Sequence, residues 1–154
     1  MDFSGEFEVG AEPKAVYEYL TNINKVSKCI PNLYKLDIKD DDNFSASFLI
    51  DVSAATESLH IEYLSHLNAK MDFTFLEKSM DNVKLEGKGR AAGTSLKITI
   101  EFQIKGLGNS SRVSWKATFT PGLLLKLFGE KLIRSVADDI INDLVACVQK
   151  SIKA

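Results

Sequence analysis

The 154-residue chain is short of several features that define common classes of protein. It has two cysteines and two histidines, and neither pair has the spacing of a metal site. No apolar stretch approaches the roughly 18 residues that a membrane-spanning helix needs. Its 19 basic and 21 acidic residues nearly balance, and no long basic block stands out. We therefore expect no metal, no membrane-spanning helix and no nucleic-acid partner.

The N-terminal stretch MDFSGEFEVGAEPK lacks the apolar segment of a secretory signal, so we expect a cytoplasmic protein. In a reducing cytoplasm Cys29 and Cys147 are expected to be free, packed thiols. A disulfide between them is the alternative, because the cytoplasm of a hyperthermophile would permit one. The length of the chain predicts a single domain over residues 1–154.

Apolar and polar residues alternate over most of the chain, which is typical of strands with one wet face. FSGEFEV at 3–9 begins the pattern, and LKITIEFQIK at 96–105 shows it most clearly. Turn sequences separate the strands at 40–43, 80–82 and 106–111. Two short helices are expected after the first strand, the first beginning at Pro13 and the second ending before Pro31.

From Leu123 to Ile152 apolar residues recur every three or four positions. This spacing predicts one long amphipathic helix, with Gly129 as a bend or a late start. A sheet with one face in solvent must bury its other, apolar face against another element, and this helix is the only predicted element long enough to cover it. We predict an α+β fold in which a curved antiparallel sheet of about seven strands wraps around one long C-terminal helix.

The segment LEGKGRAAGTSLKI at 85–98 has the composition of a phosphate-binding loop. GKGRAA matches the dinucleotide pattern G-x-G-x-x-A, but the Walker spacing fails, and the segment leads into a strand instead of a helix. Gly87 and Gly89 instead continue the inward positions of a strand. Glycine there permits close backbone approach, a sharp bend or empty space for a ligand. We expect neither a nucleotide nor another cofactor.

The inward positions of the strands and of the final helix are almost wholly apolar. We therefore predict an apolar ligand cavity between sheet and helix, and no catalytic residue. The predicted lining residues are Phe48, Ile50, Phe73, Phe75, Leu85, Gly87, Gly89, Ile98, Ile100, Phe102, Trp115, Phe119, Phe128, Leu132, Val136 and Ile140. A filled core is the alternative reading of the same residues.

Several polar or reactive side chains have structural explanations that we prefer to functional ones. His60 and His66 are expected at the surface or in a loop, because their six-residue spacing does not suit a metal site. Cys29 follows a helix end, which does not stabilise a thiolate, so packing is preferred to reactivity. Arg90 is expected to be a solvated strand residue, the alternative being a contact with a ligand head group.

The stretch GLLLKLFGEKL at 122–132 also allows two interpretations. It is expected to be the first turns of the long helix, packed on the sheet. Alternatively, it makes an amphipathic contact with a membrane or partner, into which Leu123, Leu124 and Leu127 would insert.

Four segments together resemble the family of the carbon monoxide dehydrogenase G subunit, over nearly the whole chain. They are FSGEFEV near the start, KCIPNL at 28–33, GKGRAAGTSLKITIEF at 87–102 and FGEKLIRSVADDIINDL at 128–144. The family belongs to the START-like (SRPBCC) superfamily, similar to the birch pollen allergen, so the resemblance implies the helix-grip fold. It also implies an accessory protein for a molybdenum hydroxylase of the carbon monoxide dehydrogenase type, which family members recruit to the membrane.

The superfamily is associated with carrying lipids, quinones or other apolar molecules, so the resemblance favours a non-catalytic carrier. Peripheral contact at the inner face of the membrane is an additional expectation. Some relatives extend beyond the long helix with a tail thought to reach the membrane, whereas this sequence stops at Ala154, so tail-mediated anchoring is not expected. The alternatives are an enzyme of the cyclase or dehydratase kind and an interaction module with a filled core.

Overall fold

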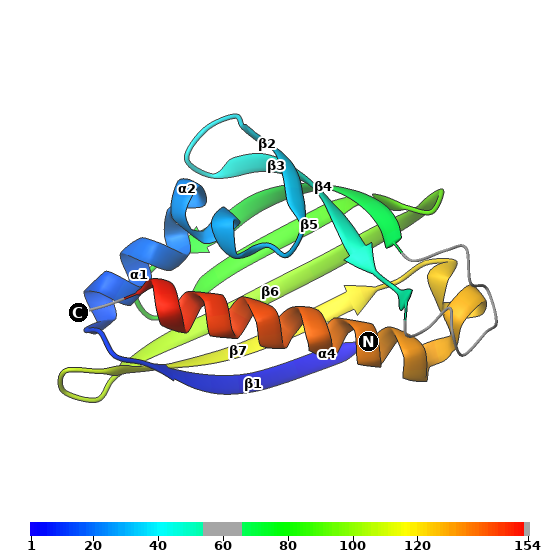
Figure 1. Ribbon diagram of the computed structural model, residues 1–154. Helices are drawn as coiled ribbons and strands as arrows, with labels where there is room; N and C mark the ends of the chain where they lie inside the picture. The colour runs from blue at the N-terminus through cyan, green and yellow to red at the C-terminus, as the bar shows by residue number, and fades with distance from the viewer. Residues whose placement is uncertain (54–65, 153–154) are drawn as a thin grey trace.

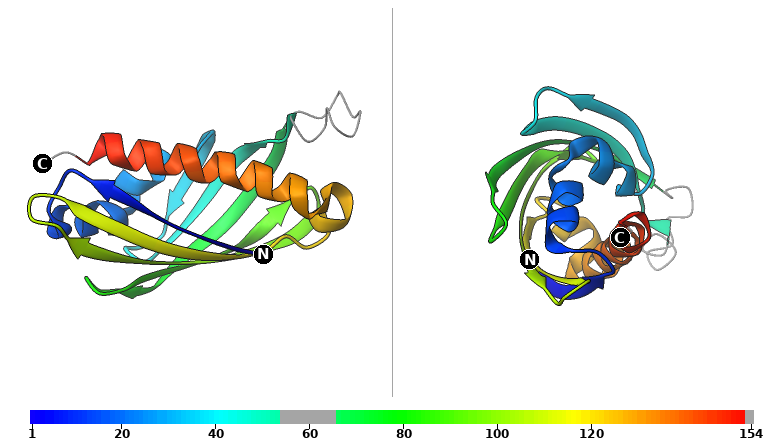
Figure 2. Two further views of the ribbon diagram at one scale, coloured as in Figure 1. Left: turned by 90° about the horizontal axis from the view of Figure 1, so that it is seen from below. Right: turned by 90° about the vertical axis from the view of Figure 1, so that its left-hand side faces the viewer.

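The computed structural model describes residues 1–53 and 66–152. Its described elements are, in chain order, β1 (Asp2–Val9), α1 (Pro13–Thr21), α2 (Ile23–Val26), the short 3-10 helix η1 (Ser27–Cys29), β2 (Leu33–Ile38), β3 (Asn43–Asp51), β4 (His66–Lys78), β5 (Val83–Ala91), β6 (Thr94–Gly106), β7 (Ser111–Thr120) and α4 (Leu124–Ser151). The strands form one antiparallel sheet in the order β1-β7-β6-β5-β4-β3-β2 (Figure 1). The sheet curves around α4, and α1 and α2 lie near the C-terminal end of that helix (Figure 2).

Local sequence explains where the first elements begin and end. Pro13 occupies the first turn of α1, where its missing N–H would have had no helical partner. The side chain of Asn22 accepts a hydrogen bond from the backbone N–H of Lys25 and caps α2. Along β1 the side chains alternate between more and less exposed. The predicted first strand and the two short helical segments after it are confirmed.

The long helix α4 runs along the concave side of the sheet (Figures 1 and 2). Gly129 interrupts it with φ 79° and ψ 160°, a conformation that is essentially restricted to glycine. The predicted bend at this residue is therefore confirmed. It separates a short first segment, beginning at Leu124, from the long remainder of the helix.

Three apolar clusters hold the described elements together. The first joins the start of α4, through Phe128 and Ile133, to β4–β6. The second joins the end of α4, through Val148, to α1, β1 and β7. The third packs Ile23 of α2 on β3, β4 and β5. The helix is thus packed at both of its ends, and α2 covers a separate part of the sheet.

The two cysteines form a disulfide between η1 and α4, so the expectation of free thiols was wrong. Cys29 and Cys147 have their Cα atoms 5.5 Å apart although they are 118 residues apart in sequence. Cys29 is buried, and the hydroxyl of Tyr19 lies 3.4 Å from its sulfur. Spacing in sequence did not indicate this pairing, because only the fold brings η1 beside the last turns of α4. The crosslink covalently fastens the C-terminal end of the helix.

Candidate functional site

The concave face of the sheet is a continuous apolar surface built from strand rows in register. One row crosses β4 to β7 through Phe73, Gly87, Ile98 and Phe119. The next row crosses the same strands through Phe75, Leu85, Ile100 and Ala117. Antiparallel pairing places directly opposed residues on one face, so the predicted inward positions do share a face. Among the described strand residues of this face the ionisable one is Lys78, which opposes Val83 at the end of β4 and pairs with Asp42.

Much of this face is only partly buried. Of the predicted lining residues, Phe75, Gly87 and Phe128 are buried. The others are only partly buried: Phe48, Ile50, Phe73, Leu85, Gly89, Ile98, Ile100, Phe102, Trp115, Phe119, Leu132, Val136 and Ile140. In the described part of the chain, Ile100, Trp115 and Ile140 belong to none of the three clusters. Phe48, Phe73 and Phe102 link the clusters to one another, whereas Ile100, Trp115 and Ile140 lie outside them.

The position of α4 accounts for this incomplete burial. The backbone of α4 lies near β1 and η1 along more of its length than near the central strands. Trp115, on β7, turns its ring toward β1 and lies over Gly5, whose Cα would carry a Cβ 2.9 Å from the ring. Side chains of the central strands therefore project toward a helix that lies to one side of them.

Gly87 and Gly89 make room for neighbouring side chains. A Cβ on Gly87 would lie 2.7 Å from the Phe73 ring and 2.9 Å from a methyl group of Ile98. A Cβ on Gly89 would collide with the backbone oxygen of Lys70 and lie 2.6 Å from the sulfur of Met71. Of the three roles that sequence left open for these glycines, close approach is the one that these contacts support.

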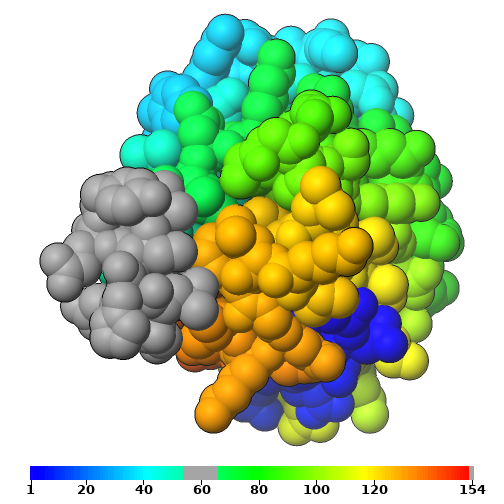
Figure 3. All heavy atoms as spheres, turned by 90° about the vertical axis from the view of Figure 1, so that its right-hand side faces the viewer, coloured from blue at the N-terminus to red at the C-terminus, as the bar shows by residue number. Residues whose placement is uncertain are grey.

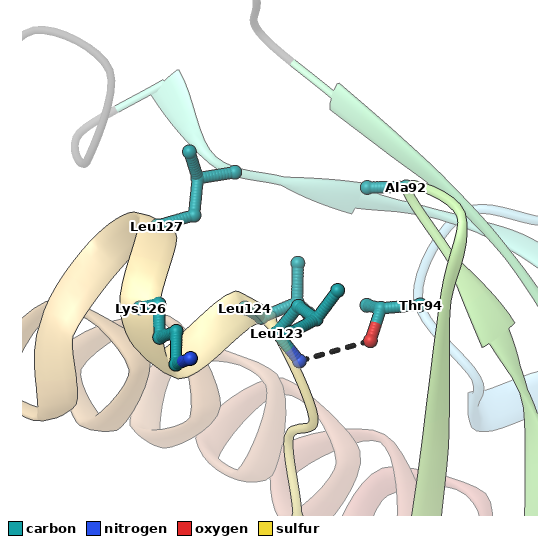
Figure 4. A pocket seen from close by; sticks show the side chains of 6 residues that line it. All are labelled: Ala92, Thr94, Leu123, Leu124, Lys126 and Leu127. Carbon is teal, nitrogen blue, oxygen red and sulfur yellow. Dashed lines mark hydrogen bonds between the residues drawn. The ribbon is translucent and has the colours of Figure 1, made fainter.

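A pocket of about 350 Å³ opens where α4 begins. Its lining comes from the turn between β5 and β6 and from the first turn of the helix: Ala92, Thr94, Leu123, Leu124, Lys126 and Leu127. The backbone N–H of Leu123 donates to the Thr94 hydroxyl at 2.9 Å, which joins these two walls (Figure 4). None of the sixteen residues predicted from sequence lines this pocket. The sequence singled out Leu123, Leu124 and Leu127 as a contact surface, but it did not indicate that the β5–β6 turn, distant in sequence, forms the other wall of a pocket.

The start of α4 exposes large apolar side chains beside this pocket. Leu123, Leu125 and Leu127 are 62%, 42% and 52% exposed. Leu124, one of the three leucines of the insertion alternative, is instead buried in the cluster at this end, as expected for first turns packed on the sheet. Figure 3 views the molecule from this end, and the first turns of α4 form much of the surface there.

A smaller pocket of about 220 Å³ lies near the β2–β3 turn. Its lining mixes charged, polar and aromatic residues: Lys39, Asp40, Asn43, Phe44, Asp72, Phe73 and Thr74. Phe73 is the one predicted cavity residue among them. Ser45 donates to the carboxylate of Asp72 at 2.5 Å, and Thr74 donates to the side-chain oxygen of Asn43 at 2.9 Å. Because these polar groups bond to one another, the pocket offers little for a ligand to bind.

The remaining polar candidates have structural roles or lie beyond what the structure describes. Arg90 is exposed, and its guanidinium donates to the carbonyl of Gly93 at 2.7 Å, so it braces the β5–β6 turn. His66 begins β4 and is exposed, as expected. His60 lies outside the described residues. Within residues 1–53 and 66–152, no group of three or more His, Cys, Asp or Glu side chains could hold a metal ion.

Comparison with known families places the chain among its relatives. The sequence model for the carbon monoxide dehydrogenase G subunit, CoxG, matches residues 5–153. The chain belongs to that family. The resemblance noted in its sequence segments is thereby confirmed. No curated protein is similar to this CoxG family member at a significant level.

Solved structures share its fold at low sequence identity. A conserved protein from Geobacillus kaustophilus is 19% identical, with a TM-score of 0.79 over 99% of this chain and 95% of its own. The ZhuI aromatase/cyclase from Streptomyces sp. R1128 is 10% identical, with a TM-score of 0.68 over 97% and 92%. A START superfamily protein from Mycobacterium smegmatis is 10% identical, with a TM-score of 0.60 over 98% and 96%. The fold is the α+β helix-grip fold of START-like proteins, as predicted.

No helix in the described ranges is long and apolar enough to cross a membrane.

Proposed function

We propose that this CoxG family member is a non-catalytic carrier that holds an apolar ligand, lipid-like or quinone-like, between the sheet and α4. One observation carries the proposal: Ile100 and Trp115 on the sheet and Ile140 on α4 are apolar and only partly buried. A ligand that covered Ile100, Trp115 and Ile140 would remove their remaining apolar surface from water. Such burial stabilises a complex by about 25 cal/mol for each Å² covered.

The apolar concave face argues against the two alternatives. A cyclase or dehydratase needs at least one ionisable group at the substrate, and the described strands of this face provide only Lys78, which lies at the end of β4 and is paired with Asp42. The likeness to an aromatase/cyclase concerns the fold alone. An interaction module with a filled core would bury the central residues, whereas Trp115 and Ile140 are partly exposed.

The pocket at the start of α4 is the proposed entrance. The disulfide fastens the far end of the helix, so any movement of α4 that admits a ligand is easiest at the Gly129 end. Leu123 and Leu127 line this entrance together with Lys126, and Leu125 is exposed on the same helical turn. Exposed leucines beside a cation suit shallow, peripheral contact with an anionic membrane surface.

The proposed partner is a molybdenum hydroxylase of the carbon monoxide dehydrogenase type, and this proposal rests on family membership. We place the carrier in the cytoplasm, at the inner face of the membrane. Its disulfide then fits a hyperthermophile better than an ordinary reducing cytoplasm. Recovery of the hydroxylase with the tagged carrier from native cells would support the partnership. Repeated recovery of the carrier without it would contradict the partnership and leave ligand binding untouched.

Trp115 provides a direct assay for the ligand, because it is the only tryptophan and lies on the concave face. A short-chain menaquinone analogue bound there should quench its fluorescence in a saturable manner. Ile140→Glu, which places a charge opposite the strands, should weaken binding at least tenfold. Asn142→Glu is the matched control, since Asn142 is exposed on the same helix.

Native mass spectrometry of the freshly purified protein complements this titration. A bound mass that extracts into organic solvent as a lipid or quinone would support the carrier. A bare 17.1 kDa chain together with no quenching by the quinone analogue or by a fatty acid would refute it.

A further inference from the structure

The strand β2 forms one edge of the sheet and has β3 as its sole neighbouring strand among the described elements. Its sequence, LYKLDI, carries two exposed apolar residues, Tyr34 at 57% and Ile38 at 42%. It also carries an exposed Lys35 and an exposed Asp37, whose charged groups lie 3.8 Å apart. An exposed edge strand is a template for pairing with another chain.

The hydrogen bonds around β3 show which backbone groups of β2 face the open edge. The N–H of Lys39 donates to the carbonyl of Asn43 at 3.0 Å, so this opposed pair is a hydrogen-bonded one. Bonded and non-bonded pairs alternate along an antiparallel ladder. The pair of Leu36 with Ala46, three positions earlier in β2, is therefore non-bonded. The N–H and C=O of Leu36, and by the same alternation those of Ile38, point away from β3.

The opposite side of β3 agrees with this assignment. The N–H of Phe75 donates to the carbonyl of Asp42 at 2.8 Å. By the same alternation, Phe44 and Ala46 bond to β4. The backbone N–H and C=O groups of Phe44 and Ala46 therefore point toward β4 and not toward β2. This agrees with the assignment made from the hydrogen bond between Lys39 and Asn43.

We propose that β2 pairs antiparallel with β2 of a second copy of this chain, about a twofold axis at Leu36. In this register Leu36 faces its own symmetry mate, and the free N–H and C=O groups of the two Leu36 residues form two intermolecular backbone hydrogen bonds. Lys35 of each copy lies opposite Asp37 of the other. Both charges are more than half exposed and bonded only weakly within their own strand, so they are available to re-pair across the axis.

Charge selects this register over its neighbours. Shifting the axis to Asp37 opposes two aspartates, and shifting it to Lys35 opposes two lysines. Like charges directly opposite on neighbouring strands are destabilising, whereas opposite charges contribute favourably. A charged residue on an edge normally discourages pairing. In antiparallel pairing about Leu36, the sequence Lys35-Leu36-Asp37 places each lysine opposite an aspartate of the other copy. These two charges therefore favour pairing with another copy of the same chain.

Tyr34 lies outside the proposed contact. Its hydroxyl donates to Asn68 at 2.6 Å, and because Asn68 is on β4, beyond β3, the ring points across the sheet and away from the open edge. The pocket at the start of α4 contains no residue of β2, so the dimer leaves that entrance open.

Sedimentation velocity of the full chain over about 10 µM to 1 mM tests the proposal, in the range expected for a small interface. The wild type should dimerise reversibly, with weaker association at higher salt. Lys35→Asp and Asp37→Lys should each weaken the dimer at least tenfold, because each variant opposes like charges. The double exchange, Lys35→Asp with Asp37→Lys, should restore dimerisation. Lys97→Asp makes the same charge change on a central strand and should have no effect.

A second measurement follows the backbone itself. The amide hydrogen of Leu36 should exchange slowly in concentrated samples and rapidly in dilute ones. A wild type that stays monomeric throughout, or a dimer that ignores both single charge reversals, would overturn the pairing. Neither result bears on the carrier function, because ligand binding is assayed at Trp115 on the concave face.

Discussion

Removing the disulfide between Cys29 and Cys147 should destabilise the protein without changing its fold. The two cysteines are 118 residues apart, so the crosslink closes most of the chain into a loop. Closing a loop of that length lowers the conformational entropy of the unfolded chain by an amount worth about 5 kcal/mol near 25 °C. The crosslink contributes to stability through the unfolded state. Its loss should therefore leave the secondary structure intact.

The variant with both cysteines replaced by alanine should lose about 5 kcal/mol in its free energy of unfolding. For a chain of this size that corresponds to a melting temperature about 10 to 20 °C lower. Urea unfolding monitored by circular dichroism measures the change. Reduction of the wild type with a phosphine should give nearly the same loss, since it keeps the sulfur atoms that pack beside Tyr19. Ala146→Ser, on the exposed side of the same helical turn, is the control.

Three results would refute this reasoning. A loss below about 1 kcal/mol on reduction would show that the crosslink hardly restricts the unfolded chain. Two free thiols in the unreduced, denatured protein would show that the disulfide does not form. An intact disulfide with a large loss of helix on reduction would instead mean that the bond holds the end of α4 in place, which the packing of Val148 argues against.

Three further changes test particular positions. Gly87→Ala should lower stability by about 1 to 3 kcal/mol, because its Cβ would press against the Phe73 ring, as thermal melting can measure. Gly129→Ala should lower the free energy of unfolding by about 1 to 3 kcal/mol, because alanine is strained at its positive φ. Gly10→Ala also places its Cβ in open space, but without a positive φ, and should lower stability far less. Equal effects of the two changes would exclude a backbone cause. The backbone N–H of Asp42 donates to the carboxylate of Asp40 and lowers its pKa. The stability that Asp40 contributes is therefore present above its unfolded-state pKa and is lost as the pH falls through its folded-state pKa. Asp40→Asn should therefore show a shallower loss of stability in acid, measured as the free energy of unfolding against pH.

The sequence by itself determined the types and order of the elements. Alternation in 96–105 and helical spacing after Leu123 arise from residues that are neighbours along the chain, so each pattern indicates which face of its own element meets the core. Gly129 could be recognised as a bend because glycine in a long helix has a local cost. The inward parity of the strand residues followed from the same local rule. Their shared face was therefore predictable before any strand was paired.

Tertiary structure alone decided which distant segments meet. It joined Cys29 to Cys147, and it brought the β5–β6 turn to Leu123, forming a pocket that no local pattern indicated. It also decided that Leu124 is buried while the leucines beside it are exposed. Periodicity gives the direction of a side chain relative to its own helix. Whether that direction meets protein or water depends on where the helix lies on the sheet, and this is set by packing between residues far apart in sequence.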